Sequence, residues 1–111
     1  MKTLQDKATF YVPTETAEGQ NMANEIADQA STLWGGASLT PGIGFYDSAK
    51  QEGVVRESVT LVTVFADRQV RAEWASWVKS AAIRIGIQLK QESVLVDVNG
   101  VGGLYESGTD Y

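Results

Sequence analysis

The sequence predicts a small α+β domain in which two helices cover one face of an antiparallel sheet. Three observations predict it: two segments with apolar residues at helical spacing, several short strand-like runs, and the hairpin signal Asn99-Gly100. The chain has 111 residues, the usual size of one domain. We therefore expect a single domain over residues 1–111, with residues 1–7 and 107–111 as flexible tails.

The first half of the chain predicts a strand, a helix, a loop and a second strand. Residues 8–13 form a β-branched and aromatic run that ends at a proline. In residues 20–34, apolar side chains recur at helical spacing, and Gly35-Gly36 follows as a stop signal. Glycines and a proline make residues 35–42 an expected surface loop before a strand over 43–48.

The second half predicts a hairpin, a helix and two further strands. Residues 49–53 are expected to close a hairpin into a long strand over 54–65, and Asp67 is placed to cap the next helix. Strands over 92–98 and 101–105 flank Asn99-Gly100. The apolar residues of the helix, whose two tryptophans we expect in the core, are Val70, Trp74, Trp77, Val78, Ala81 and Ile85.

This order is β-α-β-β-α-β with an additional C-terminal strand. The natural arrangement is a ferredoxin-like sandwich, with an antiparallel sheet and both helices on one face. The other face of the sheet is then uncovered. Because such faces are often buried by self-association, we expect a homo-oligomer.

Composition narrows the chemistry and the partners. The chain has no cysteine and no histidine, which removes disulfides, thiolate chemistry and the most common general base and metal ligand. A net charge of −5 disfavours nucleic acid and makes a cationic ligand more plausible. No apolar run is long enough to cross a membrane, and the N-terminus lacks a signal-peptide core, so we expect a cytoplasmic protein with no membrane partner.

Glu57 is the unusual residue of the long strand. Alternation places it on one face with mostly apolar neighbours, where an unpaired carboxylate would cost several kcal/mol or become neutral. One interpretation is a glutamate at the exposed end of the strand, or paired with Arg56, Lys79 or Arg84 across a subunit contact; the other is a ligand site. The neighbours on this face are Val55, Val59, Leu61, Thr63 and Phe65.

Other polar residues are weaker candidates. A hairpin through residues 49–53 would bring Tyr46 close to Glu57 on paired strands. Gln91 and Glu92 lie at the start of the next strand, and one of them must face the core side or the strand's end. A hairpin turn explains the glycines of residues 99–103 better than a phosphate-binding loop does.

Several short blocks, in this order, resemble the small phage-encoded S-adenosylmethionine lyases, formerly described as S-adenosylmethionine hydrolases. They are Phe10-Tyr11-Val12, the hairpin with Tyr46, GVVRES at 53–58, the second helix, QESVLV at 91–96 and GLYESG at 103–108. The resemblance implies a PII-like fold, a homotrimer with sites between subunits, and cleavage of S-adenosylmethionine to 5′-methylthioadenosine and L-homoserine lactone. It further implies a role against host restriction in the cytoplasm of an infected cell, without metal, cofactor or covalent nucleophile.

The resemblance also assigns site residues. The family's tyrosine and glutamate fall on Tyr46 and Glu57, which would be catalytic and bind substrate, and its glutamine falls on Gln91. A slip of one residue would exchange Gln91 for Glu92, so both remain candidates for substrate binding. Two alternatives stay open: a PII-like trimer that binds an adenine nucleotide or S-adenosylmethionine without turnover, and an interaction protein whose open sheet face docks a partner.

Overall fold

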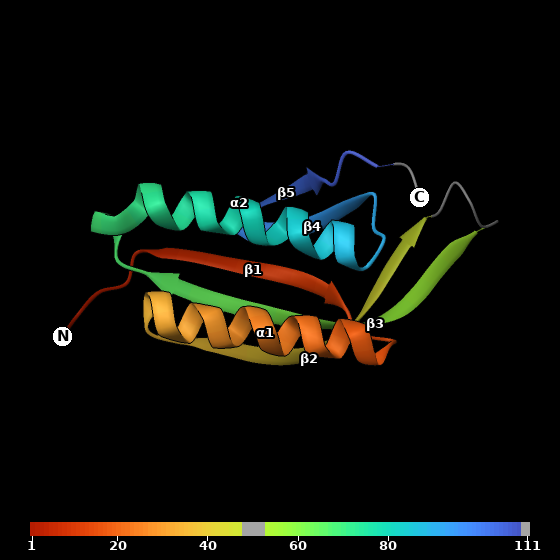
Figure 1. Ribbon diagram of the computed structural model, residues 1–111, viewed down its shortest axis with the longest axis horizontal. Helices are drawn as coiled ribbons and strands as arrows, with labels where there is room; N and C mark the ends of the chain where they lie inside the picture. The colour runs from red at the N-terminus through yellow and green to blue at the C-terminus, as the bar shows by residue number, and fades with distance from the viewer. Residues whose placement is uncertain (48–52, 110–111) are drawn as a thin grey trace.

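The computed structural model describes residues 1–47 and 53–109, which form one five-stranded sheet with both α-helices on the same face (Figure 1). The strand order is β2-β3-β1-β4-β5, and all neighbouring strands are antiparallel. The first four strands have the ferredoxin-like order and β5 extends the sheet beyond β4, so the predicted fold class is confirmed. The elements are β1 (Asp6–Pro13), α1 (Ala17–Trp34), β2 (Ala37–Asp47), β3 (Val54–Ala66), the 3₁₀ turn η1 (Arg68–Val70), α2 (Arg71–Gln88), β4 (Ser93–Val98) and β5 (Val101–Glu106).

The hydrophobic core lies between the sheet and the helices. Trp74 is fully buried, and half-buried Trp77 packs edge-on against Phe10 with ring centroids 5.8 Å apart, which confirms the expected core role of both tryptophans. Burying one large apolar side chain stabilises the fold by about 1.5–3 kcal/mol. The largest fully buried apolar residues are Trp74, Phe10, Ile26, Ile85, Val12, Val62, Val64, Val78 and Val96.

The prediction of a surface loop over residues 35–42 is wrong. Gly35 ends α1 in the left-handed conformation, as predicted, but β2 begins at Ala37 and pairs with β3 throughout. Pro41 is tolerated opposite Thr60 because β2 is an edge strand, where a missing N–H does not interrupt a second ladder.

The turns and element ends agree with the sequence in most places. Asn99 and Gly100 have φ angles of 53° and 85°, as a two-residue type I′ turn requires, so the β4–β5 hairpin is confirmed. Asp67 acts as a cap, but of η1: its carboxylate accepts a hydrogen bond from the Gln69 N–H at 2.9 Å. Residues 48–52, which include most of the predicted β2–β3 turn, lie outside the described residues.

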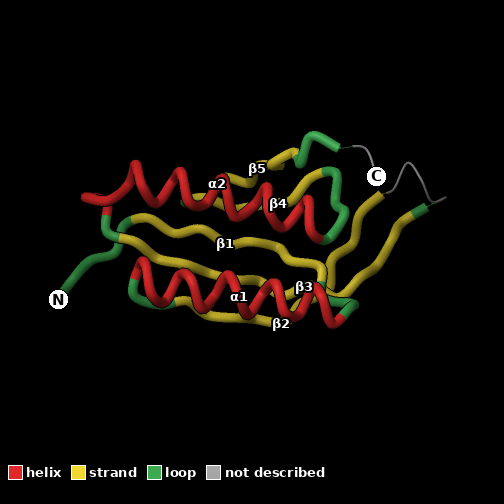
Figure 2. The backbone as a smooth tube through the Cα atoms, viewed as in Figure 1, coloured by secondary structure: helices red, strands yellow, loops and turns green. Residues whose placement is uncertain are grey.

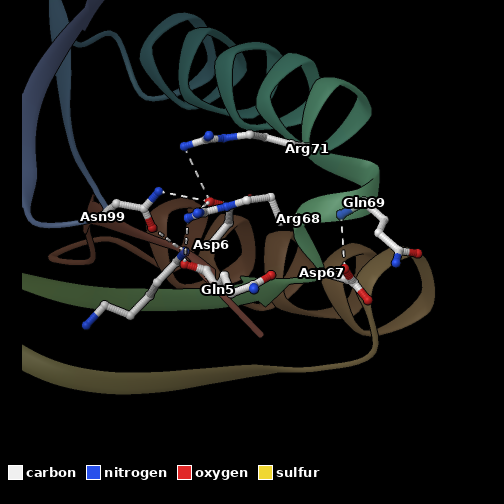
Figure 3. Close-up of polar contacts among 8 residues, drawn as sticks. Gln5, Asp6, Asp67, Arg68, Gln69, Arg71 and Asn99 are labelled. Carbon is white, nitrogen blue, oxygen red and sulfur yellow. Dashed lines mark hydrogen bonds and ion pairs between the residues drawn. The ribbon is translucent and has the colours of Figure 1, made fainter. Parts of the chain in front are cut away.

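A buried carboxylate joins three parts of the chain at one end of the sheet (Figure 3). Asp6, the first residue of β1, is fully buried, although we expected residues 1–7 to form a tail. Its Oδ1 accepts hydrogen bonds from Arg68 Nη2 at 3.2 Å and Asn99 Nδ2 at 3.0 Å, and Arg71 Nη2 lies 3.5 Å away. These contacts connect β1 to the start of α2 and to the β4–β5 turn.

Burial raises the pKa of Asp6, but the hydrogen bonds from Asn99 and Arg68 and the charges of Arg71 and Arg68 outweigh it. The pKa of Asp6 is therefore lower in the folded chain than in the unfolded chain. The stabilisation that the ionised carboxylate provides is complete above the unfolded pKa of about 4 and is lost as the pH falls through the folded value.

We expect Asp6→Asn to lower the free energy of unfolding at pH 7 by about 2–3 kcal/mol. This is less than for a fully buried pair, because both arginine side chains are about half exposed. The deficit should shrink below pH 4, where the parent carboxylate is also protonated. Urea unfolding at pH 7 and pH 3 measures both effects, with Asp28→Asn on the exposed face of α1 as the control. An equal deficit at both pH values would contradict this account.

Candidate active site

Two strands extend past the rest of the sheet as an arm, which we define as residues 42–47 of β2 and 54–58 of β3. Pro13 is the last residue of β1 and lies opposite Val59, whereas β2 and β3 remain paired as far as Asp47 and Val54. Figure 2 shows the two strands projecting beyond the start of α1, and the molecule is accordingly long, 49 × 23 × 22 Å. The base of the arm is therefore the place where β1 leaves the sheet.

Tyr46 and Glu57 lie together on one face of the arm. Tyr46 is paired with Val55, and Glu57 is paired with Gly44, so the two side chains are diagonal neighbours. Cα atoms in this relation are about 7–8 Å apart, within reach of long side chains. Gly44 places no side chain opposite Glu57, and a Cβ there would come within 3.3 Å of Val59 Cγ1. The register thus confirms that the pairing of β2 with β3 brings these two candidates near each other.

The face that carries Glu57 is the uncovered face of the sheet. Val62 and Val64 of β3 point into the core, so the odd-numbered residues of this strand, including Glu57 and Leu61, point away from the helices. Glu57 has the apolar neighbours that the sequence indicated, but it is half-buried among them on the open face and does not enter the core. Its side chain is accessible to a ligand.

No cation of the described residues forms an ion pair with Glu57. The guanidinium of Arg56 lies on the opposite face, 5.8 Å from the ring centroid of Phe45. Arg84 forms its ion pair with Glu25 at 2.8 Å. Two of the cations that the sequence suggested as partners therefore have other contacts within the chain.

A second carboxylate, which sequence reasoning missed, stands beside Glu57. Glu15 lies in the short connection between β1 and α1, and its Oε1 accepts a hydrogen bond from the Ser58 backbone N–H. The Thr14 N–H donates to the Ser58 carbonyl at 3.0 Å on the same side. No local signal marks Glu15, because its contact with Ser58 spans 43 residues of sequence.

The two acids and the tyrosine influence one another electrostatically. Burial, and then the negative charge of Glu15, raise the pKa of Glu57 above its usual range. Burial, and then the charge of Glu57, raise the pKa of Tyr46. The tyrosine is thus a protonated hydrogen-bond donor at neutral pH. A bound cation would relieve the repulsion between the carboxylates.

Gln91 and Glu92 lie across the sheet from the arm, in the connection between α2 and β4. Gln91 donates from its backbone N–H to Gly86 at 2.8 Å and from Nε2 to the Leu89 carbonyl at 3.2 Å. Glu92 lines an open concavity of about 430 Å³ with Ser93, Glu106, Gly108 and Thr109. Because β1 separates β3 from β4, two strand spacings, about 10 Å, lie between the strand of Glu57 and β4, and Tyr46 on β2 lies one spacing further away. Within one chain, the two pairs of candidates therefore lie on separate parts of the sheet.

A metal site and a membrane-spanning helix are two further features to consider in residues 1–47 and 53–109. There, no three His, Cys, Asp or Glu side chains are grouped so that they could hold a metal ion. No helix in these ranges combines the length and the hydrophobicity that a membrane crossing requires.

Comparison with known proteins supports the fold but gives no close relative. No protein-family model matches the chain, and no curated protein matches it. Two solved structures of phage SAM lyase are similar. One, in complex with S-methyl-5′-thioadenosine, has a TM-score of 0.70 at 16% identity over 95% of this chain and 92% of its own. The other, in the apo state, has a TM-score of 0.70 at 14% identity over 100% of this chain and 97% of its own. The resemblance stated from the sequence is confirmed at the level of the fold.

We expect Glu57→Gln to stabilise the protein at neutral pH. Because the folded pKa of Glu57 is raised, its charged form opposes folding, and this opposition disappears as the pH falls below that pKa. The gain should be at most about 1 kcal/mol, since solvent screens a half-exposed group. Thermal unfolding at pH 7.5 and pH 4 tests the sign, with Glu106→Gln on exposed β5 as the control. A variant that is less stable than the parent at pH 7.5 would show that Glu57 has a stabilising partner.

Proposed function

We propose that this protein is an S-adenosylmethionine lyase. It cleaves S-adenosylmethionine by an intramolecular reaction, and the products are 5′-methylthioadenosine and L-homoserine lactone. The observation that carries the proposal is the half-buried carboxylate of Glu57, which stands beside Tyr46 without a cation from the described residues. S-adenosylmethionine supplies two cations, a sulfonium and an ammonium. The similarity of fold to phage SAM lyases supports the same substrate.

The reaction needs little chemistry from the protein. The substrate carboxylate attacks the γ-carbon, a new carbon–oxygen bond closes the lactone, and the carbon–sulfur bond breaks. The sulfur keeps the bonding electrons and leaves as a neutral thioether, so no proton has to move. What remains for the protein is to fold the methionine part back on itself and to exclude water, and effective molarities of about 10⁵ M or more are available from such positioning.

In this mechanism Glu57 binds the substrate ammonium and leaves the substrate carboxylate free to attack. Tyr46, with its raised pKa, donates a hydrogen bond that orients the bound methionine part. Both side chains lie on the open face of the arm, where a ligand can reach them. Gln91 or Glu92 would contact the substrate from a neighbouring subunit, which would explain why one chain separates the two pairs of residues.

Assembly as a homotrimer would complete the site and cover the sheet. The open face exposes apolar side chains that a monomer would leave in water: Leu104 is 69% exposed and Leu95, its cross-strand partner, 39% exposed. Within an infected cell, the activity would deplete the methyl donor in the cytoplasm and so counter restriction.

The first test is product analysis. Incubation with S-adenosylmethionine should yield 5′-methylthioadenosine and homoserine lactone, separated by chromatography and identified by mass. Binding without either product would indicate the alternative, a PII-like trimer that binds an adenine nucleotide or S-adenosylmethionine without turnover. If the protein neither binds nor cleaves S-adenosylmethionine, the remaining alternative is an interaction protein that docks a partner on its open sheet face.

Steady-state kinetics test the assigned residues. Glu57→Gln and Tyr46→Phe should each lower kcat/KM at least tenfold, because a hydrogen bond to a charged group contributes about 1.5–3 kcal/mol. Asp28→Asn, on the exposed face of α1, is the control and should keep the parent's rate. Parental activity in both site variants would remove Tyr46 and Glu57 from the site.

Native mass measurement tests the assembly. The parent should run as a trimer, and Leu104→Lys should shift it towards monomer, because three lysines would then be buried in the covered face. Loss of activity in the dissociated variant, with the fold retained by circular dichroism, would agree with sites shared between subunits. A fully active monomer would contradict both proposals.

A further inference from the structure

The connection between β1 and α1 delivers an acidic side chain to the base of the arm. β1 ends at Pro13 and α1 begins at Ala17, with Thr16 as the cap whose Oγ1 accepts from the Gly19 N–H at 3.1 Å. A Cβ on Gly19 would overlap the Pro13 carbonyl oxygen, so helix and strand can meet this closely only with glycine at position 19. The connection is therefore short, and Glu15 has a fixed place in it.

Beyond the end of β1, the Glu15 side chain supplies a hydrogen-bond acceptor to β3 in place of a backbone carbonyl. Ser58 directs its N–H and its carbonyl towards β1; Thr14 bonds the carbonyl, and the Glu15 carboxylate bonds the N–H. Without this side chain, the N–H of the residue next to Glu57 would lose its partner. The hydrogen bond thus fixes β3 where its pairing with β1 ends, one residue from Glu57.

We propose that Glu15 positions Glu57 and places a second negative charge beside it, so that the site favours a ligand with two positive charges over a ligand with one. This inference rests on the proposed function and names a residue that sets its specificity. Among the described residues, the titratable groups that act on Glu57 or respond to it are Glu15, from the connection after β1, and Tyr46, from β2. Arg56 lies over Phe45 on the other face.

The loss of the positive charge on sulfur during the reaction explains how Glu15 and Glu57 would distinguish substrate from product. S-adenosylmethionine carries a positive sulfur, whereas its nucleoside product carries a neutral thioether. A negative charge beside the ammonium-binding carboxylate attracts the charged sulfur and loses that attraction once the carbon–sulfur bond has broken. Glu15 therefore favours binding of the substrate and release of 5′-methylthioadenosine.

Glu15→Gln separates the charge from the hydrogen bond, because the glutamine Oε1 can still accept from Ser58. Glu15→Ala removes both. Glu18→Gln, exposed in the first turn of α1, makes the same change of charge three residues away and serves as the matched control. All three variants are made in the whole 111-residue chain.

The ligands are sinefungin, which is not cleaved and carries an ammonium where the substrate has its sulfonium, and S-adenosylhomocysteine, which is neutral at that position. Calorimetry should show that the parent binds sinefungin more tightly, and that Glu15→Gln lowers this preference by about two- to fivefold, the range for partly exposed charge pairs. Glu18→Gln should keep the parent's preference. An unchanged preference in Glu15→Gln, or an equal loss in Glu18→Gln, would overturn the proposal.

A second readout does not depend on any ligand. In nuclear magnetic resonance titrations of the free protein, the pKa of Glu57 should be lower in Glu15→Gln than in the parent, because the repulsion is gone. An unchanged pKa of Glu57 would refute the electrostatic role. If the parent binds neither ligand and cleaves no S-adenosylmethionine, the proposed function fails, and this titration alone decides the role of Glu15.

Discussion

The close approach of α1 to the end of β1 is the constraint on which the candidate site depends. Only glycine fits at position 19 against the Pro13 backbone, although glycine within a helix costs about 1 kcal/mol relative to alanine. The chain therefore leaves the sheet abruptly after Pro13, while β2 and β3 continue as the arm. The same turn carries Glu15 to Ser58 and thereby to the neighbourhood of Glu57.

An arm of this kind is poorly suited to an isolated chain. On the face turned away from Glu57, it exposes Ile43, Phe45 and Val54, which are 52%, 66% and 70% exposed, and it extends past the layer of helices that would cover them. A two-stranded ribbon alone is marginally stable in water. Contacts with a second chain would bury these side chains, in keeping with a site completed by a neighbouring subunit.

The sequence predicts the features that are set by residues close together in the chain. It misses features that are set by a strand's position in the sheet. The second helix and the Asn99-Gly100 turn follow from local periodicity and turn chemistry. The start of β2 does not, because Pro41 and the glycines around it are typical of a loop and are tolerated only at the edge of a sheet.

The candidate site likewise has one part that the sequence predicts and one part that it does not. The proximity of Tyr46 and Glu57 follows from strand alternation and one hairpin, which are visible in the sequence. Glu15 is invisible, because the turn that brings it to Ser58 is set by packing between Gly19 and Pro13. The roles of Gln91 and Glu92 both stay predictions. The two residues lie in the connection between α2 and β4, and neither belongs to the arm that carries Glu57.

Two carboxylates show how differently this chain treats buried and half-buried acids. Asp6 is fully buried, and the fold surrounds it with Arg68, Arg71 and Asn99, so that its pKa falls despite the burial. Glu57 is less buried, yet burial and then the charge of another acid, Glu15, raise its pKa. A fold that supplies cations to one acid and a second negative charge to the other does not use the second acid for its own stability. Such an arrangement suits an acid whose partner arrives with the ligand.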